Sequence, residues 1–147
     1  MGLDMYLSKR TYIGANYEHN AVTGTIDIFR RGEHVNIDLH KVTYIYEEVA
    51  YWRKANHIHR WFVENVQNGE DDCREYEVSG KQLKELIKLC RKVLRNKSKA
   101  DELLPTQSGF FFGGTDYDEY YFEDIKNTIK MLKDIKEDED YEYCASW

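Results

Sequence analysis

The sequence lacks the features that would place the chain in a membrane or cross-link it. No apolar run approaches the roughly 20 residues that a helix needs to cross a bilayer. The first residues show neither the basic nor the apolar region of a secretion signal. The three cysteines, Cys73, Cys90 and Cys144, are odd in number and far apart, which suggests neither a disulfide framework nor a CxxC metal site. We therefore expect a cytoplasmic protein without membrane contact.

Motifs of familiar catalytic and phosphate-binding sites are also missing. The sequence has no Gly-x-x-x-x-Gly-Lys-Ser/Thr loop and no Gly-x-Ser-x-Gly nucleophile turn. His57 and His59 would project from opposite sides of a helix, so they do not form a chelating pair. Four acids could surround a hydrated magnesium, but three of the four are also expected in the first turn of a helix, which is the simpler explanation: Asp116, Asp118, Glu119 and Glu123. We predict no catalytic residue, no bound metal and no cofactor.

The charge balance bears on the class of partner. With 27 acidic and 21 basic residues the net charge is −6, which disfavours binding to duplex nucleic acid. Acidic residues gather in the last segment, so residues 136–147 are predicted to be a solvated acidic tail, or else a mimic of a phosphate backbone that meets a basic partner. The 12 tyrosines exceed what a core of this size needs, and tyrosine is a frequent contact residue. We expect a homo-oligomer.

Alternating apolar and polar residues predict strands, mainly early in the chain. Residues 3–7 begin as a strand, and residues 22–40 look like a hairpin that turns at 31–33, with Val35, Ile37 and Leu39 facing inward. The segment 42–46 is ambiguous between a third strand and the lead into a helix. Short strands are predicted at 74–78 and, as a buried aromatic strand, at 107–114.

Helical spacing of apolar residues predicts three helices. The first runs from about residue 47 to 67, the second is opened by a capping box at Ser79 and Gln82, and the third runs from 118 to about 135. The predicted fold is α+β: a small, mainly antiparallel sheet with an N-terminal hairpin, packed against the three helices. We expect one domain over residues 1–135, followed by the acidic tail at 136–147.

One edge of the predicted helix 47–67 carries an unusual set of polar and aromatic groups. They are an indole, an amide, an imidazole and two guanidiniums: Trp52, Arg53, Asn56, His59 and Arg60. Asn56 and His59 are one turn apart, so both could contact a ribose or a base edge; alternatively, both are satisfied within the fold. The arginines could hold a phosphate, or they form a solvated, salt-bridged face.

The segment 104–118 is the second candidate for a binding site. Gln107 and Ser108 supply donors next to a glycine, and Gly113 and Gly114 allow close approach of the backbone before a helix N-terminus. A purely structural role, tight turns around an aromatic strand, is the competing interpretation. Trp61 projects away from the apolar stripe of the first helix, so it either meets a partner or is covered by another local element.

Four blocks of the sequence resemble a family of small bacteriophage and prophage proteins. They are MGLDMYL at 1–7, YWRKANHIHRWF at 51–62, LPTQSGFFFG at 104–113 and YDEY at 117–120. The resemblance runs over nearly the whole chain and carries no functional residues with it. It implies a protein of the bacterial host cytoplasm, of the accessory or counter-defence kind.

The leading hypothesis is a protein that binds, and so sequesters, a nucleotide-like anionic small molecule such as a host immune signal. Trp52 would stack, while Arg53 and Arg60 would meet phosphate. Selection of the ligand falls to four further residues: Asn56, His59, Gln107 and Ser108. A second hypothesis is an inhibitor of a host defence protein that acts through its acidic, tyrosine-rich C-terminal surface. A third is a phosphodiesterase-type enzyme with His59 as general acid or base.

Overall fold

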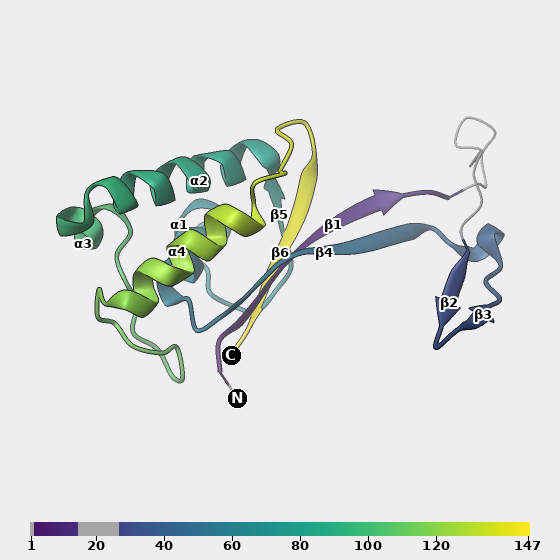
Figure 1. Ribbon diagram of the computed structural model, residues 1–147, viewed down its shortest axis with the longest axis horizontal. Helices are drawn as coiled ribbons and strands as arrows, with labels where there is room; N and C mark the ends of the chain where they lie inside the picture. Colours follow the sequence, from purple (N-terminus) through teal and green to yellow (C-terminus); the bar gives the residue numbers. More distant parts are fainter. Residues whose placement is uncertain (1, 15–26) are drawn as a thin grey trace. The chain divides into compact units, whose positions relative to one another are not determined.

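The sheet brings together strands from both ends of the chain. The computed structural model describes residues 2–14 and 27–147. Strand β1 (Asp4–Tyr12) pairs antiparallel with β6 (Asp140–Ser146), and β6 pairs antiparallel with β5 (Tyr76–Ser79). With β4 (Tyr44–Arg53) beside β1, the strand order is β4-β1-β6-β5 (Figure 1). The predicted α+β class, with a mainly antiparallel sheet, is confirmed.

Four α-helices and two 3-10 turns complete the described residues. They are α1 (Asn56–Asn65), α2 (Gly80–Arg95), α3 (Ala100–Leu103), α4 (Glu119–Met131), η2 (Leu39–Lys41) and η3 (Lys97–Lys99). The predicted capping box of α2 is present, since Gln82 N donates to Ser79 Oγ at 3.2 Å and Ser79 N donates to Gln82 Oε1 at 3.0 Å. Within the described part of the chain, none of the helices has the length and apolarity to span a membrane.

The chain divides into two compact units, and the single domain expected over residues 1–135 stays a prediction. One comprises Met1–Lys9 and Glu48–Trp147, and the other Arg10–Glu47. In the second unit, β2 (Ile28–Arg30) and β3 (Glu33–Val35) form the predicted hairpin. Its turn residues Arg31 and Gly32 both have positive φ, as a type I′ turn requires. Residues 22–26 of the predicted hairpin lie outside the described residues, and Ile37, predicted to face inward, is exposed.

The predicted helix over 47–67 is wrong in its first half, because β4 continues to Arg53 and α1 begins only at Asn56. In the strand, Ala50 and Trp52 are buried while Tyr51 and Arg53 are exposed, which is the period of a sheet with one face covered. Aromatic residues suit a strand as well as a helix face. Trp52 and Arg53 therefore lie on a strand, on opposite faces, and not beside Asn56 on a helix.

The predicted acidic tail also differs from the structure. Residues 140–146 form β6, the strand between β1 and β5, and its residues Tyr141, Tyr143 and Ala145 are buried. Acidic residues alternate with buried residues along this strand. The acidic composition alone therefore predicted a tail, although the alternation is that of a strand. Strand β6 is consequently an interior strand of the four-stranded sheet.

The structure overturns the predicted aromatic strand at 107–114 and decides between the two alternatives for Trp61. Residues 107–114 form a loop and not a buried strand, with Phe112 buried but Phe110 and Phe111 exposed. Trp61 is only 8% exposed and packs edge-on against Phe62, at 5.1 Å between ring centroids. Of the two interpretations of Trp61, the one in which the protein itself covers the indole is correct.

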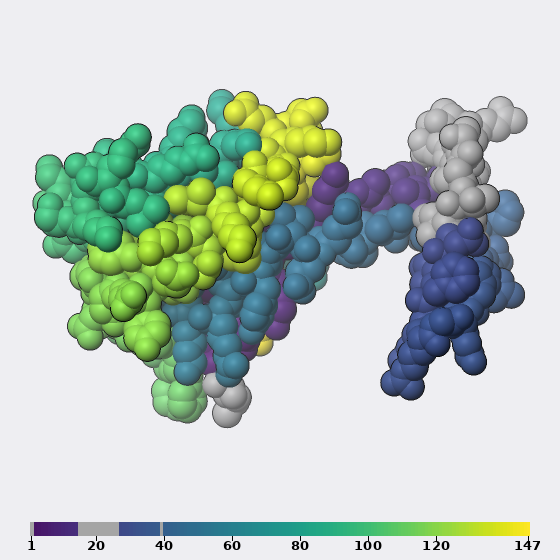
Figure 2. Space-filling view, viewed as in Figure 1, coloured from purple at the N-terminus to yellow at the C-terminus, as the bar shows by residue number. Residues whose placement is uncertain are grey.

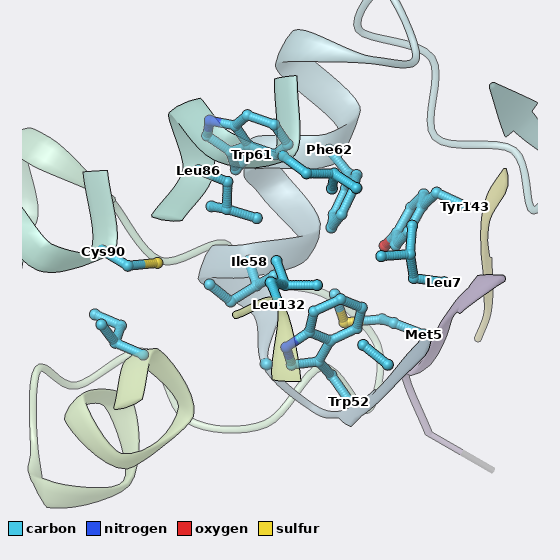
Figure 3. Packing of buried hydrophobic residues seen from close by; sticks show 14 of the residues in the cluster. Met5, Leu7, Trp52, Ile58, Trp61, Phe62, Leu86, Cys90, Leu132 and Tyr143 are labelled. Atoms are coloured by element: carbon cyan, nitrogen blue, oxygen red, sulfur yellow. The ribbon is translucent and has the colours of Figure 1, made fainter. Parts of the chain in front are cut away.

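The core of the larger unit is organised around aromatic rings (Figure 3). Phe62 of α1 stacks on Tyr143 of β6 with 3.7 Å between ring centroids and nearly parallel planes. Trp52 meets Phe62 edge-on, and its indole Nε1 donates to Thr128 Oγ1 of α4 at 2.8 Å. These contacts hold α1 and α4 on the same face of the sheet.

Gly80, the first residue of α2, packs against the backbone of the 136–139 turn. A Cβ at this position would lie 1.7 Å from Lys136 O. We expect Gly80→Ala to lower the free energy of unfolding by about 1–3 kcal/mol, the usual cost of overpacking. Urea unfolding followed by circular dichroism measures the change.

Gly114→Ala is the matched control, because nothing lies within 4 Å of the Cβ it would add. Its effect should stay within about 0.5 kcal/mol. Equal unfolding midpoints for the Gly80 and Gly114 variants would contradict the packing described for α2.

Candidate functional site

The side-chain amide of Asn56 holds the loop that follows Pro105. Its Nδ2 donates to Phe112 O at 3.1 Å and to Gly114 O at 2.8 Å, while its Oδ1 accepts from the backbone N of Gln107 at 3.0 Å. The side chain is almost fully buried, so all three bonds form away from water. Asn56 is thus a positioning residue that fixes the loop against the start of α1.

Arg60 adds a second attachment to the same loop. Its Nη1 donates to Thr106 O at 3.1 Å, and its Nε donates to Glu64 at 2.7 Å one turn further along α1. Of the two alternatives for the arginines, the salt-bridged face therefore describes Arg60. The loop it helps to fix forms one wall of a cleft.

The cleft has a volume of about 390 Å³, within the range of small-molecule sites. Two cations, Arg53 and Lys54, line it at the turn from β4 to α1. Three carboxylates line it from the loop and from α4 and its cap: Asp116, Asp118 and Asp124. Its lining therefore carries both signs of charge, with the cations and the carboxylates contributed by different segments.

His57 lines this cleft and is the residue that the sequence analysis missed. It is only 3% exposed, its ring lies 4.3 Å from that of Tyr121, and its Nε2 has no hydrogen-bond partner among the described residues. Burial lowers the pKa of His57 to about 3, so the imidazole is neutral at physiological pH. His57 also borders a smaller hollow of about 230 Å³ beside Arg60. A buried polar atom without a partner is costly and invites a ligand or a water.

Asp124 is the second unusual group of the cleft. Its carboxylate is half-buried and has neither a hydrogen bond nor an ion pair within the described part of the chain. Burial, with the neighbouring charges of Asp118 and Glu123, raises the pKa of Asp124 to about 6. The carboxylate is therefore ionised but uncompensated at pH 7.

A neighbouring hollow of about 490 Å³ lies between the end of β4 and α4, and it shares Arg53 and Asp124 with the cleft. Lys130 and Lys133 of α4 line it. On the face shown in Figure 2, the yellow-green α4 borders the blue end of β4. Arg53 is thus the cation common to both openings, with further cations on either side of it.

His59 lies apart from the cleft, with both ring nitrogens bonded inside the fold. Nδ1 is 2.8 Å from Tyr143 Oη, and Nε2 is 3.0 Å from Asp71 Oδ1, which also accepts from Trp147. Burial lowers the pKa of His59, against the opposing effect of Asp71. Because a carboxylate only accepts, the neutral ring donates from Nε2, and Tyr143 donates to Nδ1.

The remaining predicted site residues are distributed as follows. Arg53 and Asn56 line the cleft, whereas Gln107 contributes its backbone to the Asn56 contact and Ser108 is exposed in the loop. Trp52 is buried and faces the neighbouring hollow. Asn56 and His59 are both satisfied by hydrogen bonds within the fold, which is the second of the two alternatives stated for them. In the ranges 2–14 and 27–147, no three His, Cys, Asp or Glu side chains are grouped as metal ligands.

Comparison with protein-family models, with curated proteins and with solved structures found no match to this chain. The functional argument therefore depends on the geometry and chemistry of the cleft.

Removing the amide of Asn56 should release the loop. We expect Asn56→Ala to lower the free energy of unfolding by about 2–3 kcal/mol, because three backbone groups lose their partner. Hydrogen exchange should accelerate at residues 106–114. Asn127→Ala, at an exposed position of α4, is the control and should change neither quantity; an equal loss in both variants would refute the role of Asn56.

His57 should make folding sensitive to acid. Its folded pKa lies near 3, below the unfolded value near 6.5, so the unfolded chain takes up the proton first and stability falls as pH drops from 6.5 towards 3, by at most about 1.4 kcal/mol per pH unit. In His57→Gln this part of the pH dependence should disappear. Urea unfolding at several pH values compares the two proteins, and identical slopes would show that His57 titrates normally.

Proposed function

We propose that this protein binds a nucleotide-like anionic small molecule in the cleft between the β4–α1 turn, the 106–118 loop and α4. The observation that carries the proposal is the lining itself: Arg53 and Lys54 on one segment, and unpaired hydrogen-bonding groups, His57 and Asp124, on others. A nucleotide is complementary to this lining, because its phosphate is anionic and its base carries hydrogen-bond donors and acceptors.

The anionic end of the ligand meets Arg53. Its guanidinium offers a planar fork of donors suited to phosphate. Among the described residues it makes only a long contact of 3.9 Å with Asp4, and its side chain is 63% exposed. Lys54 in the cleft and Lys130 in the adjoining hollow supply further positive charge.

The base end of the ligand meets the groups on α1 and α4. His57 offers one neutral nitrogen without a partner, and Asp124 offers acceptors. Tyr120 lines the cleft and is 82% exposed, so its ring is available for stacking on a base.

In this proposal the protein sequesters the ligand and does not convert it. His59, the candidate general acid or base, has both nitrogens occupied in the core. From the resemblance of four sequence blocks to phage proteins we further propose an accessory factor, for which binding alone would remove an immune signal of the host. The inhibitor hypothesis keeps the exposed acidic residues Glu137, Asp138 and Asp140, but it cannot use the two tyrosines of residues 136–147 as contacts, because both are buried.

The proposal is tested by equilibrium dialysis against nucleoside monophosphates, cyclic nucleotides and ADP-ribose-type nucleotides. The bound compound is then released by denaturation and identified by chromatography. Recovery of the intact compound supports sequestration. An altered compound would indicate an enzyme, and absence of binding across the panel would overturn the proposal.

Arg53→Gln should weaken binding of the best ligand about tenfold or more, since a charge-assisted bond contributes about 1.5–3 kcal/mol. Arg91→Gln is the matched control, because Arg91 is exposed on α2 and does not line the cleft. Isothermal titration calorimetry measures both variants. An equal loss in the two would indicate unspecific attraction by surface charge.

A further inference from the structure

The carboxylate of Asp124 demands a particular kind of partner. An ionised carboxylate only accepts hydrogen bonds, and its two oxygens suit two parallel N–H groups. Asp118 and Glu123 bring like charge close to Asp124, while Arg53 lines both openings that Asp124 lines but makes no ion pair with it within the described residues. A ligand that brings two adjacent donors would satisfy both oxygens without adding negative charge.

We infer that the cleft selects guanine as the base, with the Asp124 carboxylate accepting from N1–H and from the N2 amino group. The inference rests on the proposed function and names the class of its ligand: a guanine nucleotide.

The other bases do not present this pair of donors. Adenine and cytosine each place an amino group beside a ring-nitrogen acceptor, and uracil places one N–H between two carbonyl oxygens. Each of them would set an acceptor against one oxygen of Asp124, which is repulsive. Guanine alone among the four has two neighbouring donors on its pairing edge.

A second observation in the same cleft supports a ligand there. The Nε2 of His57 is buried and has no partner within the described ranges, and His57 lines the cleft together with Asp124. The neutral imidazole can donate to or accept from a base or ribose according to its tautomer. His57 and Asp124 thus line the same cleft of about 390 Å³, and each carries a polar group without a partner within the described residues, which favours a ligand that contacts both.

The opposite charges of the cleft lining determine the direction in which the nucleotide binds. A guanine held by Asp124 leaves its phosphate free to meet Arg53, which lines the same cleft and the adjoining hollow. The reverse orientation would bring phosphate towards the carboxylates Asp116, Asp118 and Asp124, which repel it. The charge pattern therefore admits one direction of binding.

Calorimetric titration with GMP, IMP, XMP and AMP tests the inference on the full chain. IMP differs from GMP by the missing N2 amino group, so wild-type protein should bind it about tenfold more weakly. AMP and XMP should bind more weakly still, because each opposes an acceptor to Asp124.

Asp124→Asn provides a test in which affinity is gained. The asparagine amide keeps one acceptor for N1–H and supplies a donor, which matches the O2 carbonyl of xanthine. This variant should bind XMP more tightly than wild type does, and GMP more weakly. Asp101→Asn, at an exposed position of α3 outside the cleft, should leave the order of the four nucleotides unchanged. Circular dichroism and urea unfolding establish that both variants are folded.

The outcomes separate this inference from the proposed function. Equal affinity for GMP and AMP would overturn guanine selection while leaving nucleotide binding intact. Absence of binding by all four and by the wider nucleotide panel would overturn both. Because a guanidinium group carries the same two donors, L-arginine is titrated as well; binding of arginine without GMP would overturn the guanine assignment.

Discussion

The cleft depends on one buried amide. Asn56 is the first residue of α1, and its side chain takes the place of a neighbouring strand for residues 107–114, pairing with two carbonyl oxygens and one N–H of that loop. The loop has no regular structure of its own. Without Asn56, these backbone N–H and C=O groups would need water as their hydrogen-bond partner. The wall of the cleft that carries Thr106, Gly114 and Asp116 would then have no fixed position relative to α1.

The turn before α1 is adapted to the same arrangement. Lys54 adopts a left-handed conformation, with φ of 59°, and its backbone N donates to Leu3 O at 2.7 Å. Gly113 approaches this turn so closely that a Cβ there would lie 3.1 Å from Lys54 Cβ, and its own φ of 91° favours glycine. Strand end, turn and loop therefore constrain one another, and together they fix where Arg53 and Lys54 stand.

Local signals in the sequence were predictive where the stabilising contacts are local. The capping box at Ser79 and Gln82 and the turn at Arg31 and Gly32 involve residues within three positions of each other, and both appear in the structure. The segment 47–53 was misassigned because its aromatic residues fit a helical stripe as well as a strand, and only pairing with β1 decides between them.

The candidate site likewise depends on contacts between residues far apart in the sequence, which the sequence alone does not predict. Asn56 stood out as a polar residue on an apolar face, but its partners lie more than 50 positions away, so the sequence left open whether they belong to a ligand or to the protein. Asp124 looked like any helix acid. Its raised pKa follows from burial and from the charges of Asp118 and Glu123, and these depend on how the helix is placed. His57 was not predicted as a site residue because the predicted helix included Trp52 and Arg53, and the edge they share with Asn56 and His59 lies opposite His57.

The pairing of β1 with β6 has a consequence for biosynthesis. Asp4 lies opposite Ser146, and Leu7 opposite Tyr143, so the edge of β1 that pairs with β6 has no partner until β6 has been synthesised. A contact between such distant positions requires a large loop to close before any hydrogen bond is gained. The sheet of the larger unit is therefore completed only once β6 has emerged from the ribosome, and until then the nascent chain exposes an unprotected strand edge that chaperones can bind.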